Sequence, residues 1–320
     1  MTDVSMNAVE EIRASCRQVA ELAAHVRIDT DRIADYAGEL PIDEWGTPAY
    51  DAEHHFRGGL EDTVGYVLCL DSINFGSGWF PALRKRPGMS GYFTVSTALK
   101  DRFERDGGFS PQQLAALTPV DIVDMLGQND NLAVAELMVL FADALNDLGR
   151  WLTDRFDGRY SAVPEQAAGS AVALAGLLTE MPLFNDTADY HGRRVLFLKR
   201  AQLTAVDLSL AFDGRGPGRF SDLDRLTIFA DNLVPHVLRT DGVLRYDAEL
   251  ADAIESRVLL APGSDQELEI RACAVHAVEL LVERFDARVT AADLDYLLWN
   301  RGQQQDYRRR PRHRTRTTNY

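Results

Sequence analysis

Most of the chain shows the apolar periodicity of amphipathic helices. Apolar side chains recur at spacings of three or four residues in two long stretches. The first stretch comprises Val9, Ile12, Cys16, Val19, Ala23 and Val26, and the second comprises Leu137, Leu140, Phe141, Ala144, Leu148 and Trp151. Such spacing places the apolar groups on one face of a helix. Another helix is predicted after Ser264, because Glu267 follows it at the spacing of a capping box.

Two short apolar runs, 64–70 and 194–198, depart from this pattern. Each has the length of a brief buried strand, although a helical turn would fit the same residues. Glycine and proline clusters mark the connecting turns, and no linker, repeat or change in composition divides the chain. We therefore expect a mostly α fold with a few short β-strands. It should form one domain over residues 1–320, whose halves could be two lobes around a cleft.

Composition narrows the class of protein further. The 320 residues are 46% hydrophobic, which is ample for a globular core. No stretch approaches the roughly 18 apolar residues of a membrane span, and the N-terminal region lacks a signal-peptide core. We expect a cytoplasmic monomer with no membrane partner. The three cysteines lie far apart in apolar surroundings and the seven histidines lack ligand spacing, so we expect buried thiols, no metal and no other cofactor.

The net charge of −15 is unevenly distributed. Residues 301–320 hold seven arginines and one aspartate, and subtracting this local +6 leaves −21 on residues 1–300. So acidic a body repels polyphosphate, which argues against a broad nucleic-acid surface. The basic tail could still bind RNA, or it could fold back on the acidic body. Charge favours the second arrangement.

Lys199 is one of three lysines in a chain with thirty-one arginines, and it lies between two apolar stretches. Its compact ammonium offers a point charge and a shiftable pKa that arginine lacks. The apolar stripe that follows predicts a helix with Lys199 in its first turn, near Gln202, where the lysine can reach the mouth of a pocket. The alternative is a stem packed on apolar neighbours with its ammonium in water.

A second candidate is Asp231, which precedes Pro235 by four residues. Apolar spacing predicts a helix over 223–237. Proline lacks the amide hydrogen that would bond to the Asp231 carbonyl, so we expect the helix to bend there. The bend would place a carboxylate beside Phe229, either in a binding site or as the cap of a broken helix.

A third candidate is Asp295, in a helix predicted from Thr290 and Asp293 at its start. Asp295 shares a helix face with Trp299, four residues later, and an adjacent indole can desolvate a carboxylate and raise its pKa. A solvated face with one aromatic anchor is the alternative. The chain has no Walker loop, dinucleotide fingerprint, nucleophile elbow or paired Cys-x-x-Cys. The sequence pattern alone therefore predicts no more than a mostly helical protein with a possible acid-lined pocket.

Taken in order, these motifs and several others resemble the queuosine salvage family of queuosine 5′-monophosphate N-glycosylase/hydrolases. The segments that support the resemblance run from about residue 45 to the C-terminus: 70–75, 91–92, 197–202, 229–231 with Pro235, 269–273, 295–299 and 313–316. The resemblance implies hydrolysis of the N-glycosidic bond of queuosine 5′-monophosphate to queuine and ribose 5-phosphate. It also implies a helical fold related to DNA glycosylases, with no metal and a small-molecule substrate.

The resemblance also assigns roles to residues. The expected catalytic residues are Asp231, Asp295 and Lys199. The expected substrate-binding residues are His55 (or its neighbour His54), Asn74, Phe75, Tyr92, Phe229, Trp299, Asn300 and Arg314. Phe229 would pack on the deazapurine, whereas Lys199 and tail arginines such as Arg314 and Arg316 would meet the phosphate. The family's eukaryotic members have an acid where this chain has Asn300, so the carboxylate role would fall on Asp231 or Asp295.

Two other functions remain open at this point. The first is a non-catalytic module that binds tRNA or a modified base through the arginine-rich tail. The second is base excision from DNA, which the strongly acidic body disfavours. The main expectation is therefore an enzyme with no nucleic-acid partner.

Overall fold

The computed structural model describes residues 8–42, 48–285 and 288–320, and its fold is mostly helical, as predicted. The α-helices are α1 (Ala8–Leu22), α2 (Thr30–Glu39), α3 (Leu60–Ser72), α4 (Gly91–Asp106), α5 (Pro111–Ala115), α6 (Pro119–Leu126), α7 (Ala135–Phe156), α8 (Ala162–Gln166), α9 (Ala171–Leu178), α10 (Lys199–Ala211), α11 (Val234–Thr240), α12 (Ala248–Glu255), α13 (Asp265–Val282), α14 (Ala291–Gly302) and α15 (Gln305–Arg308). Short 3-10 helices cover Leu132–Val134, Pro182–Phe184, Gly216–Gly218, Leu223–Arg225 and Glu283–Phe285.

The β-structure consists of two small antiparallel ribbons within the described residues. β1 (Val26–Ile28) pairs with β4 (Leu244–Tyr246), and β2 (Thr187–Tyr190) pairs with β3 (Arg193–Leu196). β3 confirms most of the strand predicted over 194–198. No helix of the described residues is long and apolar enough to cross a membrane.

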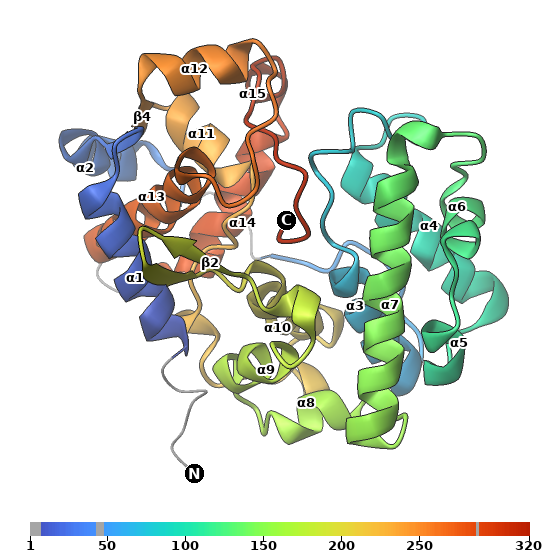
Figure 1. The fold of residues 1–320 in the computed structure, drawn as a ribbon. Helices are drawn as coiled ribbons and strands as arrows, with labels where there is room; N and C mark the ends of the chain where they lie inside the picture. The colour runs from blue at the N-terminus through green and yellow to red at the C-terminus, as the bar shows by residue number, and fades with distance from the viewer. Residues whose placement is uncertain (1–7, 43–47, 286–287) are drawn as a thin grey trace.

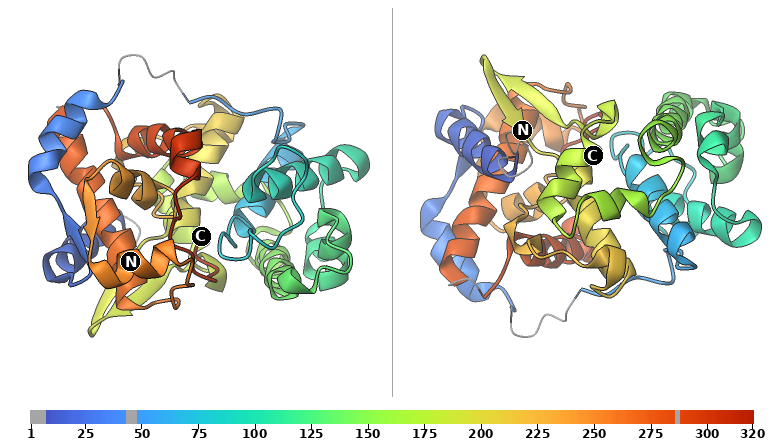
Figure 2. Two further views of the ribbon diagram at one scale, coloured as in Figure 1. Left: turned by 90° about the horizontal axis from the view of Figure 1, so that it is seen from above. Right: turned by 90° about the horizontal axis from the view of Figure 1, so that it is seen from below.

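The helices form two groups joined through a central set (Figures 1 and 2). One group contains α4 to α7, and the other contains α1, α2 and α11 to α15. Helices α3 and α10 pack against each other between them. The end of the chain also lies between the two groups (Figure 1). Segments from both groups therefore meet in the middle of the molecule.

Two of the predicted amphipathic helices are present. The stripe beginning at Leu137 lies in α7, with most of its members buried. The stripe beginning at Val9 lies in α1, but the helix ends at Leu22 and Val26 belongs to β1. The predicted helix after Ser264 also forms. The Ser264 hydroxyl accepts from the Glu267 amide as expected, while the Glu267 carboxylate accepts from the Gly263 amide, one residue before the position that a capping box requires.

The strand prediction for 64–70 is wrong, because these residues belong to helix α3. Ten consecutive residues of this helix, 63–72, are buried. A helix that is covered on every side needs no polar face, so its sequence loses the period that distinguishes a helix from a buried strand.

The helix predicted over 223–237 is also wrong. A 3-10 turn is followed by non-helical backbone, and α11 begins only at Val234. Pro235 lies in the first turn of α11, where its missing amide hydrogen costs no helical bond. The Asp231 carboxylate accepts from the amides of Leu233 (2.7 Å) and Val234 (3.1 Å). Proline thus starts a helix here and does not bend one, and Asp231 supports its N-terminus.

Glu269 fixes the N-terminal segment on helix α13. Its carboxylate is fully buried and accepts from the backbone amides of Ala24 (3.0 Å), His25 (2.6 Å) and Val26 (3.0 Å), and from the Tyr190 hydroxyl (2.9 Å). These bonds explain why the first helix stops before β1. They lie on a part of α13 that does not line the cavity described below.

We predict that Glu269→Ala lowers the free energy of unfolding by about 3 kcal/mol, because it leaves buried donors without an acceptor. Urea denaturation measures this loss. The control is Glu283→Ala, which removes an exposed carboxylate near the end of the same helix and should change stability by less than about 0.5 kcal/mol. Equal stability of the two variants would contradict the anchoring role of Glu269.

Candidate functional site

A cavity of about 670 Å³ lies where the two helix groups meet. Its walls come from α3, α4, α10 and α14, from the segment between Leu223 and Leu233, and from the C-terminal tail. Ten of the eleven predicted site residues line it: Asp231, Asp295, Lys199, His55, Asn74, Phe75, Tyr92, Phe229, Trp299 and Asn300. Arg314 is not among the lining residues. The structure thus brings together residues that are up to 245 positions apart in the sequence.

Lys199 is the first residue of α10, and its side chain extends into this cavity. The preceding residue, Leu198, has a left-handed backbone (φ 49°), which turns the chain sharply from β3 into the helix. Lys199 is buried, and its ammonium donates to the Asn74 carbonyl at 3.4 Å. Burial lowers the pKa of Lys199, while the carboxylates of Asp231 and Asp71 oppose that shift. Among the described residues, no carboxylate lies within ion-pair distance of this ammonium.

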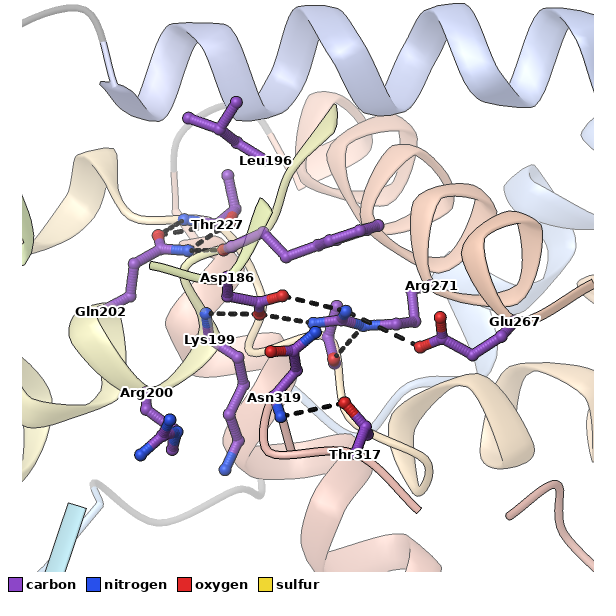
Figure 3. Close-up of polar contacts among 12 residues, drawn as sticks. Asp186, Leu196, Lys199, Arg200, Gln202, Thr227, Glu267, Arg271, Thr317 and Asn319 are labelled. Atoms are coloured by element: carbon purple, nitrogen blue, oxygen red, sulfur yellow. Dashed lines mark hydrogen bonds and ion pairs between the residues drawn. The ribbon is translucent and has the colours of Figure 1, made fainter. Parts of the chain in front are cut away.

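A buried ion pair between Asp186 and Arg271 fixes the backbone at Lys199 (Figure 3). The Asp186 carboxylate accepts from the Lys199 amide at 3.3 Å and from the Arg271 guanidinium at 2.6 and 3.1 Å. Arg271 is fully buried in α13, and its Nε donates to the Ala230 carbonyl at 3.0 Å. Because Ala230 directly precedes Asp231, the Asp186–Arg271 pair connects the backbones of two of the three predicted catalytic residues, Lys199 and Asp231. Glu267 lies on the other side of Arg271, at 3.7 Å.

The two acids of the site lie on adjacent segments. The Asp295 carboxylate, on α14, accepts from the Phe229 amide at 2.9 Å. Burial raises the pKa of Asp295 well above its usual range, and the charge of Asp231 raises it further. Asp231 lies just before α11, where the amides of Leu233 and Val234 both donate to one oxygen of its carboxylate. The pocket therefore offers one carboxylate fixed in position by backbone hydrogen bonds and one whose pKa is raised by burial.

An aromatic wall faces these acids. Trp299 packs edge-on against Tyr92 (centroids 6.2 Å apart) and against Phe93 (6.1 Å). His55 Nδ1 lies 3.0 Å from the Asp51 carbonyl, and its Nε2 lies 2.8 Å from the Tyr92 hydroxyl. Because a carbonyl only accepts, Nδ1 must hold the proton and Nε2 must accept from the hydroxyl. Burial lowers the pKa of His55, in keeping with this neutral tautomer.

The remaining predicted residues take less direct positions. Of the two adjacent histidines, His55 lines the cavity, whereas His54 packs on Phe93 and contacts Asp51. Phe75 is almost fully buried and packs on Phe141. The amide of Asn300 donates to the Tyr296 carbonyl at 2.8 Å. Asn300 therefore contributes to the cavity wall while its amide is engaged within its own helix.

The basic tail folds back on the body, with Leu260 and Thr315 forming a β-bridge. The Arg314 guanidinium donates to the Arg257 carbonyl (3.0 Å), so the structure does not bring Arg314 to the cavity. Arg316 pairs with Glu136 at 3.6 Å. A Cβ at Gly78 would collide with the Thr315 carbonyl, so this close approach of the tail requires glycine.

The lining also includes residues that the sequence analysis did not name as site residues, among them Asp207, Arg312 and Tyr320. Asp207 lies two turns after Lys199 on the same face of α10, a spacing that could have pointed to it. Among the described residues, the Arg312 guanidinium forms no hydrogen bond or ion pair, and the carboxylate whose charge acts on it is Asp231. The backbone carbonyl of Tyr320 accepts from the Gly76 amide at 3.0 Å, which fixes the chain end at the cavity wall.

Over the described ranges, no group of three or more histidine, cysteine, aspartate or glutamate side chains is arranged to hold a metal ion. Among the described lining residues, the charged groups are carboxylates, the Lys199 ammonium and the Arg312 guanidinium, and aromatic rings lie beside them. Such a set can bind an anion and an aromatic ring, and it can stabilise positive charge on a bound ligand. This combination is typical of an enzyme acting on a nucleotide.

The chain belongs to the queuosine salvage protein family, whose model matches residues 54–320. It is 35% identical to a queuosine 5′-phosphate N-glycosylase/hydrolase of Sphaerobacter thermophilus, over 97% of each chain. Proteins of the same name from Dictyostelium discoideum (31% identical, over 98% of this chain and 100% of the relative) and Mus musculus (28%, over 96% and 98%) are also similar. The resemblance drawn from the short motifs is thereby confirmed.

We predict that Arg271→Met lowers the free energy of unfolding by about 3–5 kcal/mol, because Asp186 and Glu267 are left buried without their partner. Chemical denaturation followed by circular dichroism measures the loss. Arg239→Met, which breaks the more exposed pair with Glu255, serves as the control and should cost about 1 kcal/mol or less. A similar small loss in Arg271→Met would show that the buried pair does not hold the fold.

Proposed function

We propose that this chain hydrolyses the N-glycosidic bond of queuosine 5′-monophosphate to release queuine and ribose 5-phosphate. Its relatives of that name cover nearly the whole chain. The observation that supports the activity most directly is the cavity itself, in which Asp231, Asp295 and Lys199 converge beside aromatic side chains. Every chemical group that the reaction requires is present there.

The reaction breaks the C1′–N9 bond and adds water to C1′. Positive charge develops on the ribose as the bond breaks, and a fixed carboxylate in a desolvated pocket stabilises that charge. We assign this role to Asp231, because two backbone amides and the adjacent Ala230–Arg271 bond hold it in place. The electron pair of the bond returns to the base, whose nitrogen takes up a proton.

Asp295 and Lys199 are the groups suited to proton transfer. A general acid or base works best when its pKa lies near the working pH. Burial raises the pKa of Asp295 and lowers that of Lys199, so both shifts are toward neutrality. Asp295 can take a proton from the attacking water, while Lys199 can donate to the departing base or bind the anionic part of the substrate.

Phe229 and Trp299 line the same cavity and offer flat surfaces for the deazapurine, and His55 and Tyr92 extend the aromatic wall. The 5′-phosphate requires cations. Lys199 and Arg312 are the lysine and arginine side chains among the described lining residues. We therefore assign the phosphate to Arg312, with Lys199 as its partner, in place of Arg314. Binding energy from this remote group can orient the ribose for reaction.

A tRNA-binding module is the weaker alternative. The names of the relatives give it no support, and two tail arginines are already engaged with the body, Arg314 with a carbonyl and Arg316 with Glu136. The single-domain organisation, the monomeric state, the cytoplasmic location and the relationship to DNA glycosylases remain predictions from the sequence.

We expect Asp231→Asn to fold normally but to release queuine about 10²–10³ times more slowly, because an amide does not stabilise the developing charge. The Asn side-chain oxygen can still accept from the α11 amides, so stability should change little. Chromatographic assay of queuine release from the monophosphate gives the rate. Near wild-type turnover in the folded variant would transfer the role to Asp295.

We expect Arg312→Gln to lower kcat/KM for queuosine 5′-monophosphate at least tenfold while changing that for the free nucleoside little, since only the nucleotide presents the anion. Arg314→Gln is the matched control in the same tail and should affect neither substrate. Equal losses on both substrates in Arg312→Gln would mean that this guanidinium has a structural role.

A further inference from the structure

Two carboxyl groups that the reaction does not use lie at one side of the cavity. Asp207, on α10, lines the cavity two turns after Lys199, which is about 12 Å along the helix axis. Asp71, on α3, is fully buried behind it, and the two carboxyl groups lie within hydrogen-bonding reach of each other. The packing of α10 on α3 thus joins two acids whose positions in the sequence are unrelated.

Within the described residues, no ion pair neutralises these two acids. Asn74 donates to Oδ1 of Asp71 at 3.3 Å, but Oδ2 is buried and receives no hydrogen bond from the described residues. The charges of Lys199 and Arg200 act on Asp71, and that of Lys199 acts on Asp207, but the Arg200 guanidinium donates to the backbone carbonyl of Asp71 and not to its carboxylate. Burial raises the pKa of Asp71 to about 6 and that of Asp207 well above its usual range, as expected for carboxyl groups without a cation.

Three tyrosines line the cavity near the pair, yet none of them can donate to it. The hydroxyls of Tyr50 and Tyr66 donate to the carbonyls of Phe56 (2.5 Å) and Ser96 (3.0 Å), and the Tyr92 hydroxyl donates to His55. Because a hydroxyl carries a single hydrogen, each of them is already committed. What these side chains offer toward the cavity is ring surface, which attracts a cation when it is desolvated.

We propose that Asp71 and Asp207, with the surrounding tyrosine rings, form a subsite for the protonated secondary amine on the side arm of the queuine base. This inference rests on the proposed function, because that amine distinguishes queuosine from an unsubstituted 7-deazaguanosine. The bound ammonium would donate to Asp207 and supply the positive charge that the pair lacks. The subsite would therefore select the base, whereas Arg312 and Lys199 select the phosphate.

The test compares two nucleotides, queuosine 5′-monophosphate and 7-deazaguanosine 5′-monophosphate, which lacks the amine. We expect Asp207→Asn to raise KM for the first about 10- to 100-fold, with kcat changed less than about threefold. For the second nucleotide, kcat/KM should stay within about twofold of wild type. Asp71→Asn should act in the same direction. Asp224→Asn is the matched control, because it removes one negative charge from another part of the cavity lining.

Calorimetric binding of the free bases makes the test independent of turnover. Queuine should bind Asp207→Asn about tenfold or more weakly than wild type, while 7-deazaguanine binds both equally. Equal losses on both bases, or an equal loss in Asp224→Asn, would overturn the subsite. Failure of wild-type protein to cleave queuosine 5′-monophosphate would overturn the proposed function instead, and queuine binding to the variants would still decide whether the subsite exists.

Discussion

The geometry of the site depends on the buried ion pair between Asp186 and Arg271. Asp186 precedes the β2–β3 ribbon, whereas Arg271 lies in α13, so the pair connects the middle of the chain to its C-terminal helices. It fixes the first residue of α10 through the Lys199 amide and the segment before α11 through the Ala230 carbonyl. The two segments, which reach the cavity from different parts of the chain, are thereby held in a fixed position relative to each other.

Arginine suits this position because its planar fork can satisfy several acceptors at once. Three nitrogens of Arg271 are used, two on Asp186 and one on Ala230. The guanidinium also lies over the Phe197 ring, 3.8 Å from its centroid, and Tyr320 contributes a second ring at 4.9 Å. A lysine could not form this set of contacts. Tyr320 thus contacts the same side chain that is bonded to the backbone before Asp231 and, through Asp186, to the Lys199 amide.

The cavity concentrates negative charge where solvent is scarce. Asp207, Asp231 and Asp295 all line it, and among the described lining residues Lys199 and Arg312 are the lysine and arginine that oppose them. Burial of unpaired carboxylates is costly, so such an arrangement is retained where a ligand supplies the missing charge. A nucleotide with a cationic base substituent, an anionic phosphate and a ribose that becomes positive during reaction matches this distribution.

The sequence by itself determined the helical class, the starts of several helices and ten of the residues that line the cavity. Thr290 and Asp293 start α14 as predicted, where they form a capping box, and the rarity of lysine drew attention to Lys199, which is buried at the cavity. These features are local, because a cap or a composition bias needs no knowledge of distant residues. The family motifs added other lining residues, such as Asn74 and Tyr92, since several of these short motifs form parts of the cavity wall.

Only the tertiary structure decided which groups meet. The run 64–70 shows no helical spacing of apolar residues, because α3 is covered on every side. Asp71 and Asp207 are neighbours only because α3 packs on α10. Residues 311–320 form no helix, so the packing of each neighbouring residue decides which way an arginine of this segment points. Arg312 lines the cavity, whereas Arg314 does not. Local patterns fix what a residue can do, while long-range packing fixes its partners, because contacts across hundreds of residues leave no period in the sequence.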